Sequence, residues 1–146
     1  MYSREDALVN DFISCIPKSP FAKDGLLGVS KEFNYNRGRA DIILMTFDNE
    51  VVAFEAKLQK WREALHQAYR NTCFAHSSYI IVPKVVAERA AQYEIEFAQR
   101  LVGICYVNNN KIVIARKAIK SIPIQEWLLR RAQNTLIGGE IYGKVN

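Results

Sequence analysis

The sequence has no apolar run long enough to cross a bilayer. Its longest apolar stretches, such as 79–83 and 103–107, are far shorter than the roughly 20 residues that a membrane-spanning helix needs. The N-terminal stretch Met1–Asp6 turns polar and acidic where a signal peptide would place its apolar region. These features predict a cytoplasmic protein with no membrane partner.

Cysteine and histidine are also scarce. Cys15, Cys73 and Cys105 are widely spaced and odd in number, which fits neither a disulfide framework nor a zinc site. We therefore expect three buried thiols. His66 and His76 have no paired cysteines, so no ligand spacing favours zinc.

Internal repeats, low-complexity segments and linkers rich in proline or glycine are absent as well. A chain of 146 residues with 49% hydrophobic and 24% charged residues has the size and composition of a globular protein that buries a core. We expect one domain that spans 1–146. The net charge of +5 permits nucleic-acid binding through phosphate attraction, and it equally fits a soluble basic protein without such a partner.

Apolar periodicity predicts where helices and strands lie. Helical spacing of apolar residues favours helices at 4–16, 59–74, 85–100 and 124–133. Short apolar runs favour strands at 31–35, 40–47, 51–57, 78–82, 103–107 and 111–115, with turns at 48–50 and 108–110. This order, αβββαβαββα, predicts an α/β fold with a central mixed β-sheet flanked by helices.

Three charged residues gather at one end of the predicted 51–57 strand. Glu55 and Lys57 are two residues apart, so their side chains point to the same face. Asp41 opens the preceding strand, and a hairpin centred near Asn49 pairs it with a position close to 57, within a residue or two. Two carboxylates and a lysine are therefore expected to converge.

This set of residues suggests a particular chemistry. Two carboxylates side by side in apolar surroundings are costly unless a cation joins them, and Mg²⁺ takes one or two carboxylates while it keeps several waters. The cation could polarise a phosphate, and Lys57 could orient or help deprotonate water or neutralise charge on the phosphoryl oxygens. The chemistry indicated is phosphodiester hydrolysis.

The same residues also have a purely structural interpretation. Glu55 and Lys57 could form a solvated pair on an edge strand, with Asp41 as a turn residue after Gly38. The apolar surroundings disfavour this interpretation, because a central strand rarely ends in two charges on one face.

The segment Gly38-Arg39-Ala40-Asp41 before an apolar strand, followed by Phe54-Glu55-Ala56-Lys57 and a helix, resembles the PD-(D/E)XK nuclease superfamily. The resemblance covers a core of about 4–115, which leaves a C-terminal helix and tail at 124–146. It implies a restriction-endonuclease-like fold and a nuclease that uses Mg²⁺ or Mn²⁺ on DNA, as an endonuclease in preference to an exonuclease. Ala40 stands where the family's name has proline, a mild departure that is frequent among relatives.

The resemblance also implies roles for individual residues. Asp41 and Glu55 would be metal ligands, the Ala56 carbonyl a further ligand, and Lys57 the catalytic lysine. The alternative for a chain that keeps this fold is a DNA-binding or regulatory protein that does not cleave.

Two further site residues follow from the resemblance. Many members carry an acid on the first helix, for which Glu5 is the best match, while Asp6 and Glu32 remain open. Glu5 would also be favourable in a first helical turn through the helix dipole alone. Several branches add a glutamine on the helix after the lysine, which is Gln67 here with Tyr69 nearby, although a glutamine at this helical position also fits simple solvation.

Basic side chains surround the predicted site and could hold phosphates, although each one also fits a solvated rim. They are Arg37, Arg39, Lys60, Arg62 and Arg70. Trp61 and Trp127 occupy apolar helical positions, which favours core packing over base stacking. A small nuclease that engages both strands of a duplex commonly works as a symmetric dimer, so a homodimer is a further hypothesis.

Overall fold

The computed structural model describes residues 2–36 and 38–137. Its centre is a six-stranded sheet in which the strands lie in chain order. They are β1 (Leu26–Tyr35), β2 (Gly38–Thr46), β3 (Val51–Ala56), β4 (Ser77–Ile81), β5 (Val102–Asn108) and β6 (Lys111–Arg116). The β3–β4 and β4–β5 pairs are parallel and the other pairs are antiparallel, so the predicted mixed sheet is confirmed.

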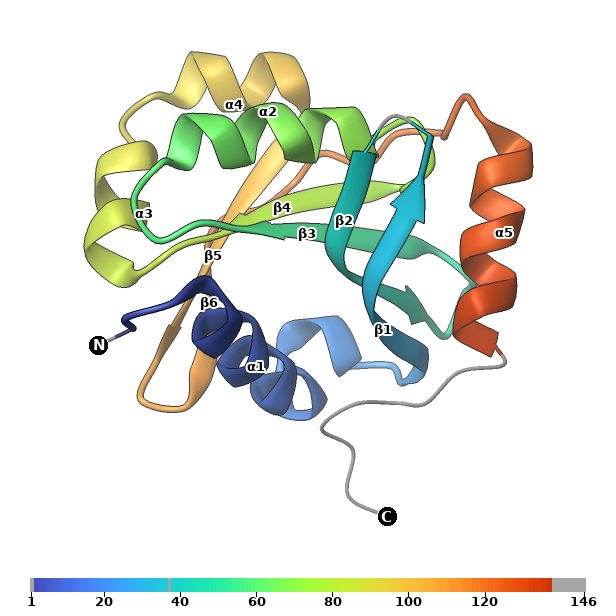
Figure 1. Ribbon diagram of the computed structural model, residues 1–146, viewed down its shortest axis with the longest axis horizontal. Coiled ribbons are helices and arrows are strands. Elements are labelled where there is room, and N and C mark those ends of the chain that lie inside the picture. Colours follow the sequence, from blue (N-terminus) through green and yellow to red (C-terminus); the bar gives the residue numbers. More distant parts are fainter. Residues whose placement is uncertain (1, 37, 138–146) are drawn as a thin grey trace.

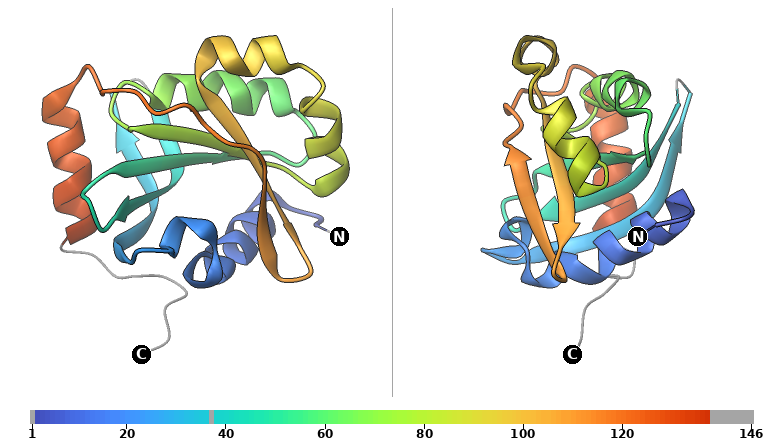
Figure 2. Two further views of the ribbon diagram at one scale, coloured as in Figure 1. Left: turned by 180° about the vertical axis from the view of Figure 1, so that it is seen from behind. Right: turned by 90° about the vertical axis from the view of Figure 1, so that its left-hand side faces the viewer.

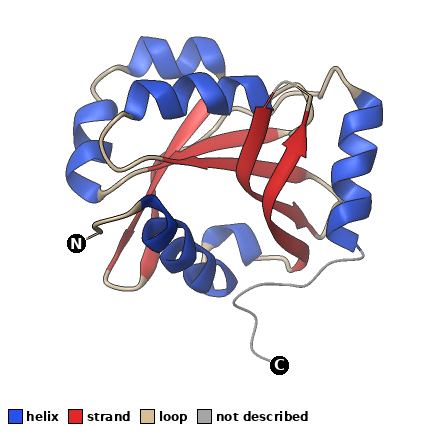
Figure 3. Cartoon of the chain, in the orientation of Figure 1, coloured by secondary structure: helices blue, strands red, loops and turns tan. Residues whose placement is uncertain are grey.

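Helices cover both faces of this sheet (Figure 3). They are α1 (Glu5–Cys15), α2 (Trp61–Asn71), α3 (Lys84–Ala90), α4 (Glu94–Arg100) and α5 (Glu126–Ile137), with short 3₁₀ turns at Ile16–Lys18 and Pro20–Ala22. In Figure 1, α1 lies below the sheet, α2 and α4 lie above it, and α3 lies at its left-hand end. Seen from behind, β5 and β6 form a hairpin remote from β1 (Figure 2). The predicted α/β class is confirmed, and the arrangement is consistent with a restriction-endonuclease-like fold.

The face of the sheet that α1 covers has its own apolar core. Leu8, Phe12 and Ile16, the three residues whose spacing predicted the first helix, are all fully buried. They pack in one cluster with Ile42 of β2 and Phe54 of β3. Burial of side chains of this size stabilises the fold by about 1.5–3 kcal/mol each.

The opposite face carries two further clusters. One joins α2, α3 and α4 to β4 and β5, and Trp61 belongs to it with only 8% of its surface exposed. The predicted helix at 85–100 is wrong in one respect, because it is divided into α3 and α4. Tyr93 leaves helical geometry with φ −98° and ψ 55°, and its ring packs 5.0 Å from the Trp61 ring. This tertiary contact accompanies the break that local periodicity did not reveal.

The second of these clusters anchors α5 on β1 and β2. Its buried stripe is Leu128, Ala132 and Leu136. Gly28 of β1 lets the helix approach, since a Cβ there would lie 2.2 Å from the Leu136 carbonyl oxygen. Trp127 lies beside this stripe and is 56% exposed, so its predicted place in the core is wrong.

Other expectations are modified in detail. The first strand begins at Leu26 instead of 31, because 26–30 also pairs with β2 through a bulge. Cys15 and Cys105 are buried, but Cys73 is half-buried, and no disulfide joins the described residues. The tail predicted at 138–146 lies outside these residues. No helix between 2 and 36 or 38 and 137 has the length and apolar character needed to cross a membrane.

Candidate active site

The β2–β3 hairpin brings Asp41 to Glu55. The last pair of this ladder is Ile42 opposite Phe54, and continuing the register by one step places Asp41 opposite Glu55. Beyond the pair, the Asp41 Oδ2 atom accepts a 2.8 Å hydrogen bond from the Ala56 N–H. The sequence-based register, which paired Asp41 with a position close to 57, is therefore shifted by about two residues. Opposed residues of an antiparallel pair point to one face, so the two carboxylates are neighbours.

Glu55 is a buried carboxylate at the end of β3, with only 1% of its surface exposed. Burial raises its pKa from an ordinary value of 4.5 to about 8, and the neighbouring Asp41 carboxylate adds to the rise. A hydrogen bond from Asn71 and the charge of Arg39 oppose this rise. The metal-free protein therefore holds a proton at this site near neutral pH.

Asn71 and Tyr35 complete a chain of hydrogen bonds behind Glu55. The Asn71 Nδ2 atom donates to Glu55 Oε2 at 2.7 Å, and the Tyr35 hydroxyl donates to Asn71 Oδ1 at 2.6 Å. Sequence reasoning missed both residues. A signal for Asn71 existed, because it follows Gln67 by four positions and so lies on the same helical face.

Lys57 lies just beyond β3 and between two helices. Its Nζ atom is 3.8 Å from Glu5 Oε2 on α1 and 3.7 Å from Glu63 Oε1 on α2. The lysine side chain is 22% exposed, so the ammonium group is partly withdrawn from solvent. Glu5 therefore stands beside the lysine, and Glu63 is a neighbour that sequence reasoning did not identify.

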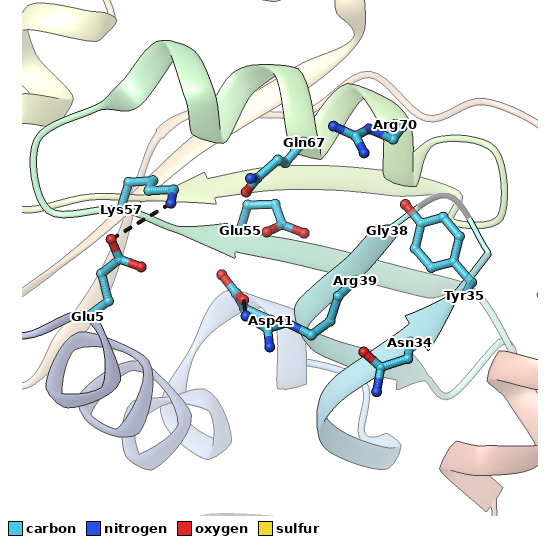
Figure 4. Close-up of a pocket in the computed structure, with 10 residues that line it drawn as sticks. All are labelled: Glu5, Asn34, Tyr35, Gly38, Arg39, Asp41, Glu55, Lys57, Gln67 and Arg70. Carbon is cyan, nitrogen blue, oxygen red and sulfur yellow. Dashed lines mark ion pairs between the residues drawn. The ribbon is translucent and has the colours of Figure 1, made fainter.

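Both carboxylates of the pair, Lys57 and Glu5 line one cavity of about 380 Å³ (Figure 4). Its walls are Glu5, Asn34, Tyr35, Gly38, Arg39, Asp41, Glu55, Lys57, Gln67 and Arg70. In Figure 4, Gln67 descends from α2 toward Glu55, and Lys57 and Glu5 face each other at the other end. The structure thus brings the five residues of the predicted catalytic set together in one cavity, and Asn34, Tyr35 and Gly38 form other parts of its wall.

The other candidates for the fourth acid lie elsewhere. Asp6 pairs with Arg4 at 2.9 Å on the exposed side of α1. Glu32 of β1 lies 3.7 Å from the guanidinium of Arg39 on β2, and it does not line the cavity. Of the three acids left open by the sequence, Glu5 alone is a cavity residue.

Two of the predicted basic residues lie in the cavity wall. One guanidinium nitrogen of Arg39 is 3.7 Å from Asp41 Oδ1. Arg70 lies against Gly38, since a Cβ on the glycine would be 3.4 Å from Arg70 Nη1. This distance is an ordinary van der Waals contact, so the guanidinium packs directly against the Gly38 backbone.

The remaining basic candidates are placed differently. Lys60 pairs with Glu63 at 3.6 Å outside the cavity. Arg62 pairs with Glu96 at 3.2 Å and stacks 4.2 Å above the Trp61 ring. Arg37 lies outside the described residues. Tyr69, noted beside Gln67, is 48% exposed and does not line the cavity.

The donor set of the cavity fits one kind of metal. Within 2–36 and 38–137, no group of three or more His, Cys, Asp and Glu side chains could hold an ion, whereas structural zinc needs four such ligands. Mg²⁺ needs only one or two carboxylates and fills its shell with water. Burial and the Asp41 carboxylate raise the pKa of Glu55, and a bound divalent cation would offset both effects by stabilising the two negative charges. The pair therefore fits Mg²⁺ or Mn²⁺.

Comparison with known proteins adds information about the fold. No protein-family model matches the chain, and neither does any curated protein. A solved protein of unknown function from Silicibacter pomeroyi is 15% identical, with a TM-score of 0.56 over 94% of this chain and 84% of that one. A repair endonuclease from Pyrococcus abyssi is 16% identical, with a TM-score of 0.44 over 64% of this chain and 46% of that one. The similarity to the Silicibacter protein shows a shared fold. The TM-score of the Pyrococcus enzyme is too low to support an argument.

The fold and the site together define a class of protein. It is an α/β protein with a mixed sheet flanked by helices, in which the open end of the β2–β3 ladder carries a cavity. Two adjacent carboxylates, a lysine and two arginines line that cavity.

Proposed function

We propose that this protein is a nuclease that uses Mg²⁺ or Mn²⁺ to hydrolyse phosphodiester bonds in DNA, as an endonuclease. One observation carries the proposal: a buried carboxylate with a raised pKa adjoins a second carboxylate in a cavity that also holds Lys57. The likeness of the sequence to the PD-(D/E)XK pattern supports the same conclusion.

Asp41 and Glu55 would hold the cation, and the Ala56 carbonyl remains a proposed further ligand. When bound, the cation polarises a phosphoryl oxygen and makes water a stronger acid. The Ala56 N–H fixes one oxygen of Asp41, so this carboxylate is oriented before any ligand arrives. Fixed ligands of this kind reduce the reorganisation that binding requires.

Lys57 supplies the positive charge for the reaction. Its ammonium nitrogen is held between the Glu5 and Glu63 carboxylates, at 3.8 and 3.7 Å. A charged lysine stabilises the negative charge that grows on phosphoryl oxygens, and it can orient the attacking water. The role of Glu5 is then exerted through Lys57, while the Gln67 amide is placed to hydrogen-bond a phosphate or water in the cavity.

Arg39 and Arg70 provide contacts for the DNA backbone. Guanidinium groups bind phosphates through paired N–H donors, and such contacts position a nucleic acid without reading its sequence. Both arginines line the same cavity as the carboxylates, so phosphates next to the scissile bond would be within their reach. Arg37, Lys60 and Arg62 remain predicted contacts outside the cavity walls.

A cleavage assay tests this function. Closed circular plasmid and linear single-stranded DNA are incubated with Mg²⁺, Mn²⁺ or EDTA, since a closed circle has no end for an exonuclease. We expect cutting that needs the metal, that disappears in Lys57→Ala and Glu55→Gln, and that persists in the control Lys84→Ala, which changes an exposed lysine of α3. Binding without cutting would favour a non-cleaving DNA-binding or regulatory protein instead. A protein that neither binds nor cuts would leave the three charges with a structural role.

A further inference from the structure

We infer that Asn71 is a positioning residue for the Glu55 carboxylate and that the Tyr35 hydroxyl sets the orientation of the Asn71 amide. The inference rests on the proposed function, because it concerns the ability of Glu55 to bind a divalent cation. It extends that function to two residues that lie behind the ligand and that the sequence pattern did not indicate.

The contacts form one continuous chain across three elements. Tyr35 at the end of β1 donates to Asn71 Oδ1 at 2.6 Å, and Asn71 at the end of α2 donates from Nδ2 to Glu55 Oε2 at 2.7 Å. Asn71 and Glu55 are each only 1% exposed, so bulk solvent does not replace either bond. A buried side chain of this kind keeps the hydrogen bonds that the protein provides.

The bond from the Tyr35 hydroxyl supports the orientation in which the Asn71 NH₂ group faces Glu55. An asparagine amide has one accepting oxygen and one donating nitrogen, and its two orientations differ only in hydrogen bonding. Because Tyr35 donates to Oδ1, the NH₂ group is left to face the carboxylate. A flipped amide would place Oδ1 beside Glu55, and the bond that Asn71 donates to Oε2 would be lost.

This orientation matters for metal binding. A carboxylate that is held in one orientation binds a cation with less reorganisation than a freely rotating one. The amide restricts rotation of Glu55 by holding its Oε2 atom. Partners behind a metal ligand typically change metal affinity by about 10- to 100-fold when they are removed.

The Tyr35 ring has packing partners of its own. It lies 6.2 Å from the Phe33 ring and 5.2 Å from the Phe74 ring, measured between centroids. Figure 4 shows this ring at the end of the cavity, next to Gly38. Tyr35→Phe therefore removes the hydroxyl and keeps the packing, which makes it the cleanest perturbation of the chain.

Isothermal titration with Mg²⁺ and Mn²⁺ alone tests the inference without any need for cleavage. We expect the Kd of the metal to rise about 10- to 100-fold in Asn71→Ala and about 3-fold or more in Tyr35→Phe. The matched control Tyr69→Phe removes the hydroxyl of an exposed tyrosine on α2 and should bind like the wild type. Titrations are run well below each melting temperature, with circular dichroism confirming the fold.

The outcomes separate the inference from the proposed function. A role limited to stability predicts a lower melting temperature with an unchanged metal Kd, and this result in Asn71→Ala and Tyr35→Phe would overturn the inference while metal-dependent cutting by the wild type still stands. If Asn71→Ala does not fold, Tyr35→Phe alone decides. A wild-type protein that binds no divalent cation would overturn both together.

Discussion

Substitution of Glu55 by glutamine probes the buried carboxylate directly. Burial and the adjacent Asp41 raise the pKa of Glu55 from 4.5 to about 8 in the folded, metal-free protein. Between these two pH values the folded state keeps a proton that the unfolded state has released. The stabilising contribution of the protonated form is therefore complete below pH 4.5 and is lost as the pH rises through 8.

The size of the effect follows from linkage. Between these pH values the free energy of unfolding falls by up to about 1.4 kcal/mol for each pH unit. The total loss of stability therefore has an upper limit of about 5 kcal/mol. Relaxation around a buried charge reduces such values, so we expect a difference on the order of 2 kcal/mol. Glutamine has the shape of the protonated acid and carries no charge at any pH. Glu55→Gln should therefore be more stable than the wild type at pH 9 and similar to it at pH 4.5.

Urea unfolding in EDTA at several pH values measures this difference. The control Glu126→Gln changes a carboxylate that is 77% exposed and should follow the wild-type curve. Parallel curves for the wild type and Glu55→Gln across the whole range would refute the reasoning. Addition of Mg²⁺ at about 100 times its Kd should then stabilise the wild type by roughly 2.7 kcal/mol and leave Glu55→Gln unchanged.

The remaining predictions concern DNA contact, a histidine and assembly. Arg70→Ala should weaken DNA binding and lower the slope of log affinity against log salt by about 1, while Arg89→Ala should change neither in fluorescence anisotropy. His76 Nδ1 accepts a 3.0 Å hydrogen bond from the Val51 N–H, and burial lowers the His76 pKa. This contribution is present above pH 6.5 and is lost as the pH falls through the lowered pKa. The free energy of unfolding, measured with urea, should therefore fall more between pH 8 and pH 5 in the wild type than in His76→Gln. A symmetric dimer predicts a mass near twice 16.7 kDa by light scattering, and a mass of 16.7 kDa at the concentration used for cleavage would contradict it.

Local sequence patterns were sufficient to predict most of the fold. Glu55 and Lys57 could be paired from the sequence because side-chain alternation along one strand does not depend on tertiary context. The position of Asp41 needed the hairpin register, which depends on the turn. Here Thr46 N–H bonds to the Glu50 carbonyl and Asn49 has a φ of 68°, so the loop is 47–49. A turn at 48–50 would pair Asp41 with a position close to 57. The three-residue loop at 47–49, whose last residue is left-handed, shifts the register so that Asp41 lies opposite Glu55.

The contacts behind Glu55 could not be predicted in the same way. Tyr35 and Asn71 are separated by 36 residues, and they meet only because the end of β1 approaches the end of α2.

The exposure of Trp127, which the sequence placed in the core, has a different cause. The buried stripe of α5 passes through Leu128 and Ala132, and Trp127 lies about 100° around the helix from Leu128. Periodicity identifies an apolar helix but leaves its rotation against the sheet undetermined.

The position of the cavity follows from the way two strand ladders end. The parallel β3–β4 ladder continues to Ala56 opposite Ile81, whereas the antiparallel β2–β3 ladder has its last pair at Phe54. At this point the Asp41 side chain accepts the hydrogen bond of the Ala56 N–H in place of a strand partner. One carboxylate thus satisfies the main chain where the strands separate and is held beside Glu55 by the same bond. The bond pairs a main-chain donor that lies beyond the last pair of the β2–β3 ladder, and because the acceptor at position 41 is acidic, it also creates the carboxylate pair.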